Sequence, residues 1–120
     1  MMSVRKLSWR QIPAWALAAF FVVGSGINLA APPATATDYL RWGYPAWFHF
    51  VTGGLELATA ILLALSATRL VGATLGCMVM LAATATVAVH GEYAHAIPPI
   101  VVFALATTVG WTSLRIRSAT

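Results

Sequence analysis

The sequence predicts an all-α membrane protein, an antiparallel bundle of four transmembrane helices, and three observations support this class. The chain of 120 residues is 60% hydrophobic and only 8% charged, whereas soluble domains are roughly 45–50% apolar and about 25% charged. Four apolar stretches are each close to the roughly 20 residues that a bilayer span needs. All but one of the links between them are short, and short links favour antiparallel neighbours. We therefore predict one domain over residues 1–120.

Each expected span is bounded by residues that end or start a helix. The spans cover residues 12–31, 45–66, 70–89 and 97–114. Each must be helical, because lipid offers the backbone no hydrogen-bond partners. The prolines of the long link "PPATATDYLRWGY" end the first span. The tetrapeptide "SATR" forms a turn after the second span, and Pro98 and Pro99 suit the first turn of the last helix.

Basic residues predict how the helices are oriented in the cell membrane. With four spans, one face of the membrane carries six of the seven basic residues: Arg5, Lys6, Arg10, Arg69, Arg115 and Arg117. The positive-inside rule therefore places both termini in the cytoplasm. A basic start, an apolar run and "ATA" at residues 34–36 also fit a cleavable signal peptide, which would leave three spans. The apolar run is longer than the roughly 7–15 residues of a signal core, so we expect it to be retained.

A narrow polar stripe follows the second expected span. Residues three, four and seven apart share one face of a helix. On this face stand His49, Thr52, Gly53, Glu56, Thr59 and Ala60. An acidic side chain facing lipid at mid-depth would cost about 2.5–3.5 kcal/mol, so the stripe must face the bundle interior. Glu56 lies about 16 Å below Pro45 at a rise of about 1.5 Å per residue, which is near the midplane.

Small residues on the neighbouring spans complete this interior. The third span carries a line of Gly72, Gly76, Val79, Ala83, Thr86 and His90, and the first contributes Gly24, Ser25 and Asn28. A G-x-x-x-G pair lets helices approach closely. We therefore predict close packing, against the second span or another copy of the chain, at small residues of both spans. These packing residues are Gly53, Gly72, Gly76 and Ala83.

The polar residues describe a funnel that opens to the outer face and is closed below. Asn28, His49 and Thr86 each lie about one turn below the outer surface, and the third span ends at its rim. The candidate ligand-binding or proton-handling residues are Glu56, His49, Asn28, Thr52 and His90. Thr107 or Thr108 on the fourth span lies at the depth of the glutamate and is its candidate hydrogen-bond partner.

The protonation state of Glu56 decides what this interior can do. No Lys or Arg stands within a span, and desolvation disfavours a carboxylate. We therefore predict a protonated Glu56, with His49 as the nearest candidate cation. Ionisable groups inside membranes are by default functional candidates. The alternative is that Glu56 only ties helices together through hydrogen bonds.

Other chemistry finds little support in the sequence. The side chains considered for a metal are His49, His90, Glu56 and Glu92. Imidazole and carboxylate suit zinc or iron, but these four lack tight ligand spacing, so we predict no metal site. One cysteine, Cys77, excludes an internal disulfide. The scattered basic residues favour anionic lipid headgroups, and not nucleic acid, as partners.

Four short motifs carry a family resemblance. They are "GYPAWF" at residues 43–48, "GGLELATAILL" with Glu56, "TRLVGA" with Arg69 and "VHG" with His90. Through them the chain resembles the DoxX-like family of small four-helix membrane proteins, best over the second and third spans. In many relatives the first span ends with a Lys-Leu pair, where this chain has Asn28-Leu29. If that lysine pairs with the glutamate in relatives, its absence weakens an ion-pair mechanism here.

The resemblance implies a fold and two classes of function. The family name comes from a subunit associated with thiosulfate:quinone oxidoreduction, which implies a redox-associated subunit. Such a protein would bind a quinone or another small apolar ligand in the outer funnel, with Glu56 and His49 handling protons, beside a membrane or redox protein partner. The alternative is a non-enzymatic membrane component: a scaffold, a chaperone-like partner or a small-molecule transporter subunit.

Overall fold

The protein is all-α, as predicted. A computed structural model describes residues 2–119. Its elements are α1 (Met2–Ala30), α2 (Pro33–Arg41), α3 (Phe48–Ala64), α4 (Arg69–Val89) and α5 (Ile97–Ala119), with short 3-10 helices η1 (Ser66–Thr68) and η2 (Tyr93–Ala96).

Within residues 2–119, three helical stretches are long and apolar enough to cross a membrane. They are Gln11–Ala30, Ser66–Val89 and Tyr93–Ile116, which correspond to the first, third and fourth expected spans. The second expected span, 45–66, is shortened to the 17 residues of α3. Pro45 accepts a turn hydrogen bond from the Phe48 amide before α3 begins, and Leu65 leaves the helix with an extended backbone. Three of the four expected spans therefore qualify by length. That α3 also crosses the membrane, as a four-span bundle requires, stays a prediction.

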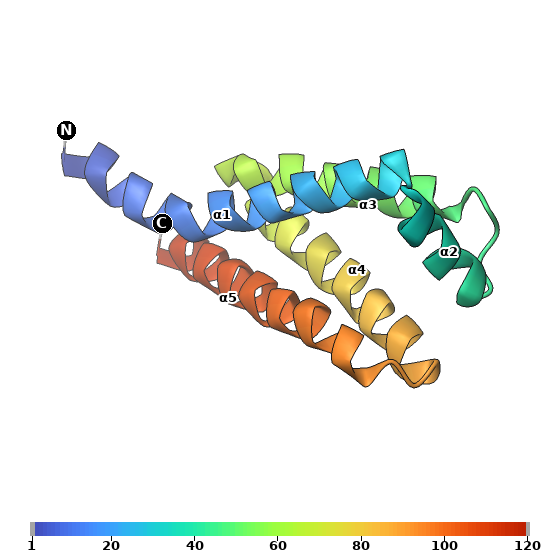
Figure 1. Ribbon diagram of the computed structural model, residues 1–120. Helices are drawn as coiled ribbons and strands as arrows, with labels where there is room; N and C mark the ends of the chain where they lie inside the picture. Colours follow the sequence, from blue (N-terminus) through green and yellow to red (C-terminus); the bar gives the residue numbers. More distant parts are fainter. Residues whose placement is uncertain (1, 120) are drawn as a thin grey trace.

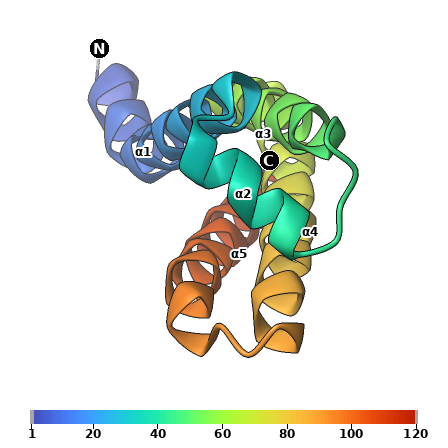
Figure 2. The same ribbon diagram turned by 45° about the vertical axis from the view of Figure 1, so that its right-hand side comes forward.

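The long link after the first span contains a helix, α2, that the sequence analysis did not predict. Pro33 stands at its start, where the missing proline N–H costs nothing and the fixed φ angle suits a helix. The helix ends before Gly43, whose φ of +85° is a left-handed conformation that glycine adopts readily. Figure 2 shows α2 lying across one end of the other helices.

The four long helices pack unequally. α1 lies beside α3, α4 packs against both α3 and α5, and α1 touches α5 only slightly (Figure 1). The shared apolar core belongs to the half of the bundle where α1 begins. Its members are Ala14, Leu17, Ala18, Phe21, Ala60, Leu63, Ala73, Met80, Val102, Ala106 and Val109. Towards the α2 end, α1 and α5 diverge, as both views show (Figures 1 and 2).

Three of the four predicted packing residues lie at close helix contacts. A Cβ atom at Gly72 would stand 2.7 Å from the backbone nitrogen of Leu63, and one at Gly53 would stand 2.8 Å from the side chain of Leu29. A Cβ at Gly76 would meet the Phe21 ring at 3.2 Å. These glycines therefore allow α3 to approach α1 and α4 closely. The fourth, Ala83, is described below.

Arg69 has a structural role in addition to its expected place among the cytoplasmic charges. Its side chain is buried, and its Nε donates to the Leu63 carbonyl at 2.8 Å and its Nη2 to the Ala64 carbonyl at 3.1 Å. Carbonyls in the last turn of a helix have no partner within that helix. Arg69 therefore caps the end of α3 from the first residue of α4.

Candidate functional site

A cavity of about 510 Å³ occupies the half of the bundle nearest α2. Residues of α1, α3, α4 and α5 form its walls, and α2 covers its outer end (Figure 2). The polar groups at its inner part are Asn28, Thr52 and Glu56. Ala83, predicted as a packing residue, instead forms part of the cavity wall.

Asn28 is the centre of a hydrogen-bond network at the base of this cavity. Its Nδ2 donates to Glu56 Oε1 and, at 3.1 Å, to the Gly24 carbonyl. Its Oδ1 accepts a hydrogen bond from the Tyr39 hydroxyl at 2.7 Å. A hydroxyl donor on one side and two acceptors on the other fix the orientation of the amide. One side chain of α1 thus connects α2 with α3.

Glu56 is buried, with 4% of its surface exposed, yet one of its carboxyl oxygens is free. Oε1 accepts the bond from Asn28, and no described residue bonds Oε2. Among the described residues, every fully buried side-chain oxygen has a partner, so the unbonded Oε2 keeps some accessible surface. Oε2 lies against Gly24 of α1, and Glu56 itself lines the base of the cavity. A Cβ atom at Gly24 would collide with this carboxyl group, so the glycine makes room for it.

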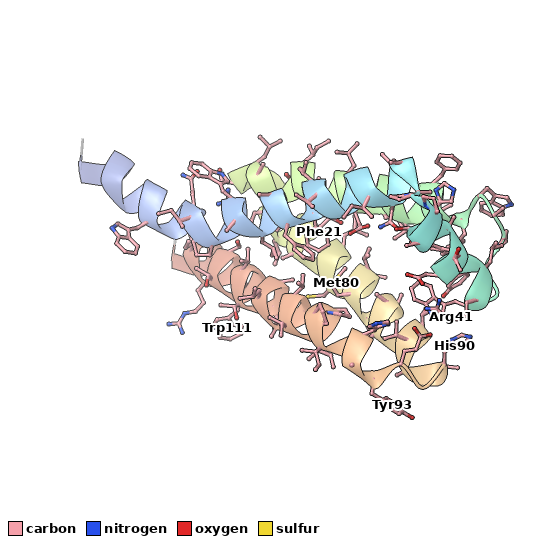
Figure 3. The ribbon with its side chains drawn as sticks, in the orientation of Figure 1. Phe21, Arg41, Met80, His90, Tyr93 and Trp111 are labelled. Carbon is pink, nitrogen blue, oxygen red and sulfur yellow. The ribbon has the colours of Figure 1, made fainter. Side chains whose placement is uncertain are left out.

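The two histidines proposed as site residues are not among the described residues that line the cavity. The His49 Nδ1 bonds the backbone carbonyl of Asn28 at 2.8 Å, and its ring lies against Phe50. His90 ends α4, is exposed, and bonds the Thr86 carbonyl at 2.7 Å. Figure 3 places His90 at the α2 end of the molecule, near Arg41. His49 is therefore linked to Glu56 only through Asn28, and His90 lies at the rim.

The expected hydrogen bond between Glu56 and the last span was wrong. Thr107 and Thr108 are exposed, and their hydroxyls donate to Phe103 and Ala104, one turn back on α5. Threonines in helices often bond backward in this way. The partner of Glu56 is Asn28, which the sequence analysis had placed in the funnel without pairing it.

No group of three or more metal-ligating side chains lies together in the part of the chain that the structure describes. His90 and His49 are held by backbone carbonyls, and Glu92 is engaged at the rim. The four side chains considered for a metal are thus divided between the cavity base, the α1–α3 contact and the outer loop.

Aromatic rings form much of the cavity wall near α2. Tyr44 and Phe48 are stacked, with ring centroids 4.4 Å apart. Tyr39 meets Trp42 edge-to-face at 5.6 Å. The Tyr44 hydroxyl bonds Thr86 at 2.6 Å, which joins this wall to α4. Such rings offer flat apolar faces to a planar ligand.

Glu92 anchors α2 to the loop between α4 and α5. It accepts hydrogen bonds from Arg41 at 2.7 Å and from the Trp42 indole at 2.8 Å. It also pairs with His95 at 3.1 Å. The Arg41 guanidinium, which also pairs with Asp38, and to a smaller extent the Trp42 indole lower the pKa of the Glu92 carboxyl to about 2. We call Arg41, Trp42, Glu92 and His95 the outer latch.

Sequence analysis missed Tyr39, the cavity residue that connects α2 to Asn28. Tyr39 is buried, and its burial raises the pKa of its phenol, with a smaller opposing effect from the Thr52 hydroxyl. The signal was present in the aromatic and charged half of the long link, "DYLRWGY". Tyr39 and Trp42 are three residues apart and could share one face of a helix, but the two prolines at the start of the link favoured a loop.

Fold and site together define a small helical membrane protein with an apolar cavity beside one buried carboxyl group. The sequence profile of the DoxX-like family matches residues 12–109. The chain therefore belongs to the DoxX-like family. No significant match was found among curated proteins or among solved structures.

Proposed function

We propose that this DoxX-like protein is a redox-associated membrane subunit that binds a quinone, or a similar small apolar molecule, in the cavity above Glu56. The observation that carries the proposal is the free Oε2 of a buried carboxyl group at the base of an aromatic-walled cavity. Its volume of about 510 Å³ suits a small ligand, since such pockets measure roughly 300–1,000 Å³.

A protonated Glu56 explains how the site would recognise its ligand. No ion pair involves Glu56 within the described residues, so no positive charge compensates a carboxylate there. The protonated group accepts the Asn28 bond at Oε1 and donates its own proton from Oε2. A quinone carbonyl, a hydrogen-bond acceptor on a flat ring, complements that donor. The electrons for a quinone reduction would come from a membrane or redox protein partner, because one cysteine cannot form a dithiol.

The proposed membrane placement makes α3 the fourth span and puts both termini in the cytoplasm. The 17 residues of α3 extend about 26 Å, at the short end of the roughly 17–25 residues that span a bilayer. α1 begins and α5 ends at the same end of the molecule (Figure 1), as an even number of spans requires. In a Cys77→Ser background, Thr37→Cys should react with an impermeant maleimide added to intact cells, and Ser118→Cys should not. The reverse pattern contradicts the orientation.

Binding to two Glu56 variants tests the proposed function. The probe is a decyl-substituted benzoquinone titrated into protein in lipid nanodiscs, with bound ligand counted by native mass spectrometry. Glu56→Gln keeps a donor and an acceptor and should bind within about threefold of wild type, but an amide cannot titrate, so quinone reduction in membranes should stop. Glu56→Ala removes the donor and should lose at least about tenfold in affinity, since a good charge-free hydrogen bond contributes about 0.5–1.5 kcal/mol and the cavity wall also changes.

The matched control is Thr107→Val, because Thr107 is exposed and does not line the cavity. Unchanged binding in Glu56→Ala would contradict the role of the carboxyl group. A wild-type protein that holds a stable protein partner and no small molecule would instead favour the non-enzymatic scaffold, chaperone-like or transporter-subunit role. The same spectra report whether the chain forms a homo-oligomer.

A further inference from the structure

Between α1 and α5, exposed apolar side chains line the cavity, and we call this side the side opening. These helices touch only slightly, and both views show them diverging towards the α2 end (Figures 1 and 2). On the α1 edge, Phe20 is 43% exposed and Ile27 is 48% exposed while both line the cavity. On the α5 edge, Pro98 lines it and is also exposed. The same side chains thus contact the cavity and the surroundings of the bundle.

The backbone at this opening suits an apolar neighbour. The first amides of a helix have no partner within that helix, and an unpaired amide facing hydrocarbon is costly. Pro98 and Pro99 stand at the start of α5 and carry no N–H. The α5 edge of the opening therefore exposes fewer unpaired backbone N–H groups than it would with other residues in place of the two prolines.

The end of the cavity that faces away from the core is covered. α2 lies across it, and the outer latch holds α2 to the loop before α5 through Glu92. Tyr39 and Tyr44 add bonds to Asn28 of α1 and Thr86 of α4. Asp38 and His95, whose side chains are partly exposed, line the cavity beside this cover. The edge formed by Ile27 and Pro98 is instead apolar, which suits entry from the lipid.

We propose that the ligand is a tailed, membrane-resident amphiphile, whose hydrogen-bonding head lies at Glu56 and whose hydrocarbon tail leaves between Ile27 and Pro98 into the lipid. This inference rests on the proposed function and specifies its ligand class. The cavity holds the head, with Asn28 and Thr52 beside it, and the opening holds the tail. An untailed, water-borne solute would gain nothing from the side opening.

Two probes and two tryptophan variants test the role of the opening. The probes are a dimethoxy-methyl-benzoquinone with a decyl chain and the same ring without the chain, each compared at equal mole fraction in nanodisc lipid. Wild type should bind the tailed probe at least about tenfold more tightly. Ile27→Trp fills the opening and should weaken the tailed probe about tenfold while changing the untailed probe less than about threefold. Val22→Trp, at a residue 52% exposed and outside the cavity lining, should change neither.

Each outcome decides a different point. Equal affinities for the two probes, with no effect of Ile27→Trp, would overturn the side-entry inference and leave the proposed function standing. A wild-type protein that binds neither probe would overturn the proposed function and this inference with it. If Ile27→Trp lowers the melting temperature or fails to fold, Pro98→Trp on the opposite edge must give the same selective loss. Unchanged binding of the tailed probe in Pro98→Trp would also overturn the inference.

Discussion

The bond between Asn28 and Glu56 makes a quantitative prediction about how the helices are held together. In Asn28→Ala, Glu56 Oε1 loses its only partner among the described residues, and Glu56 is 4% exposed. Leaving a buried polar group unsatisfied costs about 1–3 kcal/mol. Tyr39 also loses its acceptor, but the Thr52 hydroxyl is beside it, so we assign most of the cost to Glu56. Glu56→Ala should likewise lower the stability by about 1–3 kcal/mol, because Asn28 Nδ2 then keeps only the Gly24 carbonyl as a partner.

The two losses share one interaction, so they should not add. A double-mutant cycle measured by thermal unfolding in detergent should give a coupling free energy of about 1–3 kcal/mol between Asn28 and Glu56, within the range of contacting residues. At roughly 4 °C per kcal/mol for a chain of this size, each single variant should melt about 4–12 °C below wild type. Glu56→Gln should melt close to wild type, and Thr107→Ala is the exposed control. Additive single-variant costs would show that the two side chains do not interact, and would refute the network.

Three further predictions test packing, capping and the latch. Gly72→Ala places a Cβ 2.7 Å from the α3 backbone and should lower the stability of the protein by about 1–3 kcal/mol. The control Gly54→Ala meets nothing within 4 Å and should raise the stability by about 0.5–1 kcal/mol. Equal melting shifts in the two variants would contradict the contact at Gly72. Arg69→Met leaves two α3 carbonyls uncapped and should lower thermal stability by about 1–3 kcal/mol, which Arg69→Lys should partly restore. The pKa of Glu92 falls from 4.5 to about 2 on folding, so its contribution to the latch is complete above pH 4.5 and is lost as the pH falls through about 2; Trp42 fluorescence should follow this change in wild type and not in Glu92→Gln.

Helix content and the position of the acidic residue were predictable because both follow from one-dimensional patterns. Hydropathy marked the long apolar helices, and the cost of a carboxyl group in lipid required Glu56 to face inward. The same periodicity assigned Asn28 and Thr52 to the interior, where they line the cavity. The periodicity of a single helix was enough to decide which way each of these residues faces.

Pairings between helices were not predictable in the same way. Estimated depth favoured Thr107, at the level of Glu56, over Asn28, which was placed about one turn below the outer surface, yet Asn28 is the partner. Depth along a helix does not say which helix stands opposite Glu56. The order of packing, with α1 beside α3 and α5 away from it, decides the pairing. α2 was missed because its stability comes from contacts far along the chain, including the latch to Glu92. Local sequence contains the prolines that open α2 but not those partners.

Asn28 decides what the base of the cavity is connected to, as a comparison with a lysine at the same position makes clear. A lysine ammonium only donates hydrogen bonds, so it can pair with Glu56 but cannot accept one from α2. The Asn28 amide donates to Glu56 and accepts from Tyr39 at 2.7 Å. The base of the cavity and its cover are therefore joined through one side chain. Under the proposed function, a ligand that bonds the Glu56 carboxyl group would act on a network whose other end is α2, so we expect binding at the base to be coupled to the position of the cover.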